Sequence, residues 1–214
     1  MAAQRPESLE SAPEAVSDSS SKVTWGFTAS IDGFITGPEH DMAWLEACPP
    51  MDDEVVARLA APVGVIISGR RGYDAAKAQA AERGELTSEA YGGAWDGVEI
   101  VLTHRPHELE GDPSVTALDV DVAEAVRRAR ALADGKDVQI ISADIARQAL
   151  ELDLVDELQV FSAPVLLGDG TRAFSVSGGR RVDWELVGPI PGAELGFGRI
   201  YRPRRAARSG EGAE

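Results

Sequence analysis

The stretch VDELQVFSAPVLLGDGTRAF, residues 155–174, decides the fold. Its centre, residues 157–167, is rich in apolar side chains and predicts a strand, and Gly168 and Gly170 predict a turn after that strand. The preceding residues 144–151 carry apolar side chains at helical spacing. A helix that leads into an apolar strand is typical of an α/β domain.

The same alternation continues along the chain on both sides of this stretch. Six more strands are predicted, at residues 22–30, 63–67, 98–102, 138–141, 181–187 and 197–203. Helical patterns at residues 73–83 and from Asp121 onward lie between them, and the last two strands read as a hairpin. The predicted fold class is therefore α/β, with a mixed sheet that is mostly parallel, an antiparallel C-terminal hairpin and flanking helices. Ligands of such sheets bind beyond the carboxyl ends of the strands.

One domain is expected between two tails. Residues 1–21 and 204–214 hold few large apolar side chains and cannot offset the entropy of ordering, so they predict disordered tails. Residues 22–203 predict a single globular domain, and the whole-chain content of 43% hydrophobic and 27% charged residues is ordinary for one.

Composition excludes several classes of function. A net charge of −15 disfavours nucleic acid, whose phosphates need a basic surface. No apolar run reaches the roughly 18 residues of a membrane span, and the single cysteine, Cys48, fits a reducing cytoplasm. Three histidines and one cysteine lie too far apart to predict a metal site, and no Gly-x-Ser-x-Gly nucleophile motif occurs. We therefore expect a cytoplasmic enzyme that binds a small molecule.

Four short motifs stand at predicted strand ends: SIDGFITG (30–37), SGRRGYD (68–74), LTHRP (102–106) and ISADIA (141–146). Together with residues 155–174, and in this order, they resemble the dihydrofolate reductase-like family. The branch they most resemble is the C-terminal reductase domain of riboflavin-biosynthesis deaminase-reductases and its stand-alone relatives. The resemblance covers about residues 22–202.

The resemblance implies a fold, a reaction and an assembly. It implies a mixed sheet of about eight strands flanked by helices. It also implies an NADPH-dependent reductase that transfers a hydride to a small heteroaromatic, pterin- or pyrimidine-like substrate. Stand-alone relatives are often homodimers, so a second copy of the chain is an expected partner.

The loop after the first strand is the expected active-site loop. By resemblance Asp32 is its catalytic residue, which orients a substrate amine or the turn itself, and Gly33 lets the backbone turn beside the cofactor. The Asp-Gly pair is also a common turn dipeptide. Trp44, further along, either stacks on the substrate or packs in the core. Pro164 and Leu166 fit the wall of the substrate pocket, a dimer contact, or an ordinary turn.

Two basic motifs match positions that bind cofactor phosphates in the family. Gly69, Arg70 and Arg71 match the family's Gly-Arg-x-Thr motif at a helix start, although Gly72 replaces its threonine. The alternative is that these arginines pair with nearby carboxylates. The resemblance further assigns three residues to the adenosine 2′-phosphate of NADPH, namely Thr103, His104 and Arg105.

ISADIA departs from the family at the pyrophosphate turn. Relatives carry a Gly-Gly pair where this chain has Ile141 and Ser142. A β-branched Ile141 does not readily adopt positive φ, and its side chain fills space that phosphates need. Ser142 either caps the helix or donates a hydroxyl to a phosphate, and Asp144 follows it among the predicted cofactor residues.

Two hypotheses follow from these motifs. In the first, the chain is an NADPH-dependent oxidoreductase. In the second, the same fold has lost its cofactor groove and acts as a small-molecule binder or as an enzyme without redox chemistry. The departures at Gly72, Ile141 and Ser142 motivate the second hypothesis.

Overall fold

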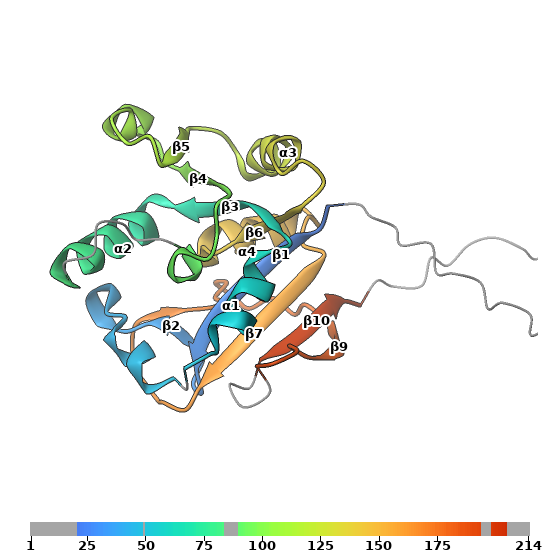
Figure 1. Ribbon diagram of the computed structural model, residues 1–214. Helices are drawn as coiled ribbons and strands as arrows, with labels where there is room; N and C mark the ends of the chain where they lie inside the picture. Colours follow the sequence, from blue (N-terminus) through green and yellow to red (C-terminus); the bar gives the residue numbers. More distant parts are fainter. Residues whose placement is uncertain (1–20, 49, 84–89, 194–197, 205–214) are drawn as a thin grey trace, which may run out of the picture.

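The computed structural model describes residues 21–48, 50–83, 90–193 and 198–204 (Figure 1). Eight strands form the main sheet: β1 (Val23–Ser30), β3 (Val63–Gly69), β4 (Val98–Leu102), β5 (Val115–Leu118), β6 (Asp137–Ile140), β7 (Glu157–Ala163), β9 (Trp184–Pro189) and β10 (Arg199–Pro203). The α-helices are α1 (Asp53–Ala60), α2 (Arg70–Arg83), α3 (Val122–Leu132) and α4 (Ala143–Glu151). Four short 3₁₀ helices are η1 (Pro38–His40), η2 (Ala43–Ala47), η3 (Ala90–Gly93) and η4 (Pro106–Leu109).

The strand order in the main sheet is β5-β4-β3-β6-β1-β7-β10-β9. Neighbouring strands from β5 to β7 run parallel, whereas β10 pairs antiparallel with β7 and β9 antiparallel with β10. This confirms the predicted α/β fold with a mostly parallel sheet and an antiparallel C-terminal hairpin. Because six strands are parallel, the loops that follow β4, β3, β6, β1 and β7 all leave from the same edge of the sheet.

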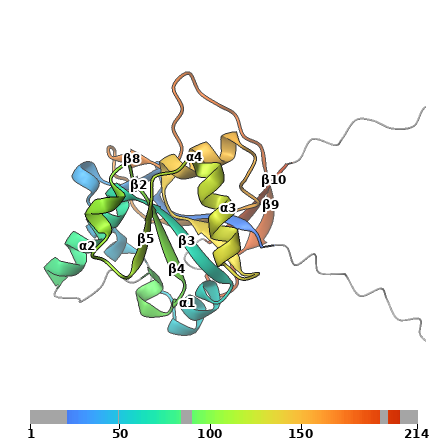
Figure 2. The ribbon, with the colours of Figure 1, turned by 90° about the horizontal axis from the view of Figure 1, so that it is seen from above.

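The core lies between one face of the sheet and two helices. Val65, Ile67 and Ile100 on this face are fully buried, together with Val126 of α3 and Ala146 of α4. Figure 2 shows α3 and α4 side by side over the sheet. The apolar stripe of α3 and the period-2 alternation of the strands explain this packing.

The opposite face carries α2. Tyr73 of α2 and Val101 of β4 are both buried in a second, smaller apolar cluster with Leu109 of η4. Val101 and its neighbour Ile100 belong to different clusters because successive strand residues point to opposite faces. Both faces of the parallel strands are thus covered, as the continuous apolar runs predict.

Four strands differ from the sequence-based prediction. The predicted strand 157–167 ends at Ala163, since Pro164 has no N–H to continue a ladder. β5 was not predicted from sequence, and neither was the separate two-stranded sheet of β2 (Phe34–Thr36) and β8 (Thr171–Arg172). The predicted tails fall almost entirely on residues 1–20 and 205–214, which lie outside the described residues.

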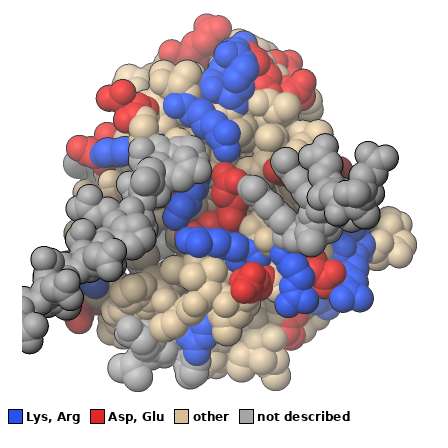
Figure 3. Space-filling model, turned by 90° about the vertical axis from the view of Figure 1, so that its right-hand side faces the viewer, with Lys and Arg blue, Asp and Glu red and all other residues tan. Residues whose placement is uncertain are grey.

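Figure 3 shows the face where β1 begins and β10 ends, on which Lys and Arg side chains alternate with Asp and Glu. Lys22 and Arg202 both pair with Glu157, at 3.4 and 3.5 Å, and Arg130 pairs with Asp156 at 3.2 Å. Interleaved carboxylates of this kind do not offer the uniformly basic surface that a phosphate backbone needs. Among the described helices, none is long and apolar enough to cross a membrane.

Candidate functional site

Asp32 joins the loop after β1 to the loop after β7. Its Oδ1 accepts hydrogen bonds from the Ser30 hydroxyl at 2.6 Å and the Leu167 amide at 3.1 Å, and its Oδ2 accepts from the Gly168 amide at 2.7 Å. These bonds, the Ser30 hydroxyl first among them, lower the pKa of Asp32 to about 2 against the opposing effect of burial. Asp32 is therefore a carboxylate at neutral pH, with no proton to donate. A catalytic role for Asp32 stays a prediction. Its hydrogen bonds instead orient the turn, which is the other role expected for it.

A second set of contacts fixes the same two loops. Gly33 has a φ of 85°, which glycine adopts without strain, and its carbonyl accepts from the Ala173 amide at 3.0 Å. The Arg172 guanidinium donates to the Asp32 carbonyl at 3.1 Å and lies 4.3 Å from the centre of the Phe34 ring. Phe34 and Arg172 are also paired across β2 and β8.

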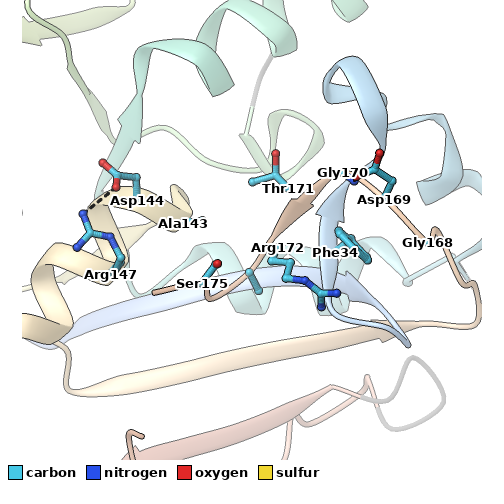
Figure 4. Close-up of a pocket in the computed structure, with 11 residues that line it drawn as sticks. Phe34, Ala143, Asp144, Arg147, Gly168, Asp169, Gly170, Thr171, Arg172 and Ser175 are labelled. Carbon is cyan, nitrogen blue, oxygen red and sulfur yellow. Dashed lines mark hydrogen bonds and ion pairs between the residues drawn. The ribbon is translucent and has the colours of Figure 1, made fainter. Parts of the chain in front are cut away.

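A cavity of about 650 Å³ opens between these loops and the start of α4 (Figure 4). Three helical residues, one residue of β2 and a segment after β7 line it: Ala143, Asp144, Arg147, Phe34, Gly168, Asp169, Gly170, Thr171, Arg172, Ala173 and Ser175. It lies at the carboxyl edge of the parallel strands, where this class of sheet binds ligands. Its volume is within the range of small-molecule sites.

The charged side chains of the cavity differ in how they are paired. Arg147 is held by Asp144 at 3.0 Å and by Glu151 at 2.7 Å. In the described part of the chain no carboxylate lies within ion-pair distance of Arg172. Ser142 occupies the N-cap position of α4, but its hydroxyl makes no capping bond, so the predicted cap is only positional. The first amides of α4 and Arg172 thus offer donors to an anionic or polar ligand.

The predicted phosphate-binding arginines lie two and three strands away from β1 along the same edge. Glu108 of η4 forms ion pairs with Arg70 at 2.9 Å and with Arg105 at 3.0 Å, and it accepts a hydrogen bond from Arg105. Arg70 also pairs with Asp74 at 2.8 Å. The alternative, in which the arginines of SGRRGYD pair with nearby carboxylates, therefore describes Arg70 in this structure. Arg105 of LTHRP shares the carboxylate of Glu108 with it.

The other predicted cofactor residues surround this cluster. His104 is exposed and its Nδ1 lies 3.0 Å from Asp119, while the Thr103 hydroxyl accepts from the Arg105 amide at 3.1 Å. Arg71 is exposed at the start of α2. A Cβ on Gly69 would come within 3.1 Å of the Ser142 hydroxyl, so the ends of β3 and β6 are close together.

Ile141 marks the departure at the pyrophosphate turn. Its amide donates to the Ile67 carbonyl at 3.1 Å, which continues the β3–β6 pairing past the end of β6. Its side chain is 44% exposed at the carboxyl edge, an unusual place for a large aliphatic group. The side chain is therefore exposed at the turn that the family resemblance assigns to the pyrophosphate.

Three predicted substrate residues do not line the cavity. Trp44, in η2, is only 9% exposed, as the packing alternative expects. Pro164 and Leu166 are exposed on the loop after β7, whose later residues Gly168 and Gly170 do reach the cavity. Contact of these three residues with substrate stays a prediction.

Sequence reasoning missed Arg147, Arg172, Phe34 and Glu108. Arg172 belongs to the matched stretch 155–174, so the pairing of that stretch with the β1 loop could have indicated it. Glu108 had no sequence signal beyond its position three residues after Arg105. Groups of three or more metal-ligating side chains are absent from the described residues.

An eight-stranded mixed sheet with a cavity at its carboxyl edge defines the class of α/β domain that the motifs indicated. The chain belongs to the RibD C-terminal domain family, whose model matches residues 21–189. This confirms the resemblance drawn from the sequence. No curated protein has a significant sequence match to the chain.

Solved structures with the same fold have low sequence identity to the chain. A protein assigned to riboflavin biosynthesis from Shewanella sp. PV-4 aligns with a TM-score of 0.65 and 18% identity, over 86% of this chain and 99% of the other. A pyrimidine reductase-like protein from Corynebacterium diphtheriae aligns with a TM-score of 0.53 and 16% identity, over 87% of this chain and 93% of the other.

The Thermotoga maritima diaminohydroxyphosphoribosylaminopyrimidine deaminase/5-amino-6-(5-phosphoribosylamino)uracil reductase gives a TM-score of 0.57 and 12% identity, over 88% of this chain. This chain spans 58% of that bifunctional protein. These likenesses establish the fold.

Proposed function

We propose that this protein is an NADPH-dependent reductase that transfers a hydride to a planar, pyrimidine-like heteroaromatic substrate. The observation that supports this most directly is the cavity at the carboxyl edge, bordered by the β1 loop, the β7 loop and the start of α4. Membership of the RibD C-terminal domain family and the reductase names of its structural neighbours agree with it.

The residues present fit a dinucleotide at this edge. Uncapped amides of α4 and Arg172, which has no carboxylate partner among the described residues, suit an anionic group near the cavity. Arg71 and Arg105 are exposed near the ends of β3 and β4, where Thr103, His104 and Gly69 also lie, and suit a second phosphate. When bound, NADPH supplies the hydride.

The chain itself contributes position and electrostatics. Asp32 holds the two loops that border the cavity, and Gly33 lets the β1 loop turn beside it. Arg172, stacked on Phe34, places a positive charge against the substrate or cofactor. Since Asp32 is ionised at neutral pH, the proton that follows the hydride comes from solvent.

A second function is favoured by one specific observation, the exposed side chain of Ile141 at the pyrophosphate turn. In this alternative the cofactor groove is lost, and the cavity serves a small-molecule binder or an enzyme without redox chemistry. The fold is compatible with both functions.

A titration with NADPH, followed by nicotinamide fluorescence or calorimetry, separates the two functions. The reductase predicts micromolar binding by the wild-type chain and at least about tenfold weaker binding by Arg172→Ala, because a charge-assisted contact is lost. Replacing Ile141 and Ser142 together by Gly should tighten binding, since it restores close backbone approach. Arg181→Ala, which removes an exposed arginine paired with Asp183, is the control.

Two results would count against the reductase. Absence of NADPH binding up to millimolar concentration in the wild-type chain, with binding gained by the double glycine variant, would favour the lost-groove alternative. Absence of binding in both chains would mean that the cavity takes a different class of ligand.

A further inference from the structure

Four basic side chains gather beyond the ends of β3 and β4. Arg70 and Arg71 open α2, and His104 and Arg105 follow β4. In a chain with a net charge of −15, such a concentration beside the start of a 14-residue helix favours an anionic ligand. Carboxylate side chains of the same chain also lie at this cluster.

Glu108 forms an ion pair with two of these arginines, and with Arg105 the contact is also a hydrogen bond. Its Oε2 is 2.9 Å from Nη1 of Arg70, and its Oε1 is 3.0 Å from Nη1 of Arg105. The Glu108 side chain is 32% exposed and that of Arg70 is 23% exposed, so water screens this contact less than it screens a fully exposed pair. Glu108 therefore occupies a guanidinium donor of Arg105 and offsets the charge of Arg70, and a phosphate would otherwise use both.

The distance between the cluster and the cavity limits the ligand that could reach both. From β4 to β6, whose end leads into α4, there are two strand spacings, which amount to roughly 10 Å. A ligand held at the cavity by the start of α4 must be extended to reach Arg105, as a dinucleotide is. This step rests on the proposed function.

We propose that Glu108 sets how strongly this protein distinguishes a 2′-phosphorylated dinucleotide from the unphosphorylated form. A 2′-phosphate carries nearly two negative charges and must displace Glu108 from Arg70 and Arg105, or be repelled by it. NADH carries no such phosphate and leaves these pairs in place. Glu108 thus weakens NADPH binding selectively, and the wild-type chain prefers NADPH only modestly.

The test is Glu108→Gln, which keeps the shape of the side chain and removes its charge. Dissociation constants for NADPH and NADH are measured by fluorescence titration at fixed ionic strength. We expect NADPH to bind about tenfold more tightly to the variant, with NADH changed by less than about twofold. Glu110→Gln removes the same charge from an exposed position two residues away and should leave the NADPH to NADH ratio unchanged.

Equal tightening of both dinucleotides in Glu108→Gln, or the same change of ratio in Glu110→Gln, would overturn the inference, because net charge alone would then explain the effect. We expect the preference for NADPH over NADH to fall at higher salt in the wild type and in both variants, because salt screens the charge of the 2′-phosphate.

A pair of smaller probes separates this inference from the proposed function. 2′,5′-ADP carries the 2′-phosphate and 5′-AMP lacks it, and neither carries a nicotinamide. If no dinucleotide binds but Glu108→Gln still increases the preference for 2′,5′-ADP, the reductase is wrong and the inference holds. If 2′,5′-ADP binds neither chain, or binds both alike, the inference is wrong.

Discussion

At the scale of single residues, Asp32 shows how a family motif and a structural role coincide. Its carboxylate accepts three hydrogen bonds that hold the loops on either side of the cavity, and they lower its pKa to about 2. Because the folded-state pKa lies below the ordinary value of 3.8, ionised Asp32 stabilises the fold above about pH 4. This contribution is lost as the pH falls from about 4 to about 2.

Asp32→Asn should therefore lower the Tm at neutral pH, because an amide nitrogen cannot accept the bond that one carboxylate oxygen accepts. The difference in Tm between wild type and variant should shrink as the pH falls from 4 to 2, and calorimetry across this range measures it. Asp96→Asn, at an exposed site outside the two loops, serves as the control. A difference that stays constant with pH would show that ionisation of Asp32 is not what stabilises the loops.

The sequence predicts the loop in which a residue lies better than it predicts the residue's hydrogen-bond and ion-pair partners. The Asp-Gly turn at Asp32 and Gly33 and the basic motifs were found in their expected loops because strand ends and turn residues have local signals. The bonds from Leu167 and Gly168 to Asp32 join residues about 135 positions apart, and no local pattern encodes them. The same holds for Glu108, whose contact with Arg70 depends on how η4 packs beside α2.

At the scale of elements, apolar runs were predictable, whereas β2, β5 and β8 were not. β3 is buried on both faces, and its residues 63–67 form a continuous apolar run. β5 has four residues, and the pairing of β2 with β8 joins three residues to two. Segments this short form strands because tertiary contacts hold them, which periodicity cannot show. Yet β2 and β8 border the cavity.

Gly170 makes the β2–β8 contact possible. Its φ is 130°, and a Cβ placed there would overlap the carbonyl of Thr36. Gly170→Ala should therefore destabilise the protein by about 3 kcal/mol, since both strain and overlap oppose it. Gly168→Ala is the matched control, because φ is 75° there but the space is open, and it should cost only about 1 kcal/mol. Urea unfolding measures both changes, and equal losses would mean that contact with Thr36 is not tight.

At the scale of the whole molecule, the sheet is closed at neither end, and β9 forms one of its edges. Among the described residues no strand pairs with its outer side, and Leu186 and Val187 are 57% and 48% exposed. An edge strand with exposed apolar side chains is a common site of association. Together with the assembly implied by the family resemblance, this supports the proposal of a homodimer that pairs through β9.

Light scattering after gel filtration tests the homodimer, because a dimer has twice the chain mass of 22.7 kDa. Leu186→Lys should shift the protein toward the monomer, since it places a charge on a surface that pairing would bury. Leu132→Lys changes a side chain of similar exposure, 50%, on α3 and should leave the dimer intact. A wild-type chain that stays monomeric at all concentrations would refute the dimer, and equal effects of the two variants would place the interface elsewhere. Since β9 lies at the edge beyond β7 and β10, the loss of the dimer should leave NADPH binding at the cavity unchanged.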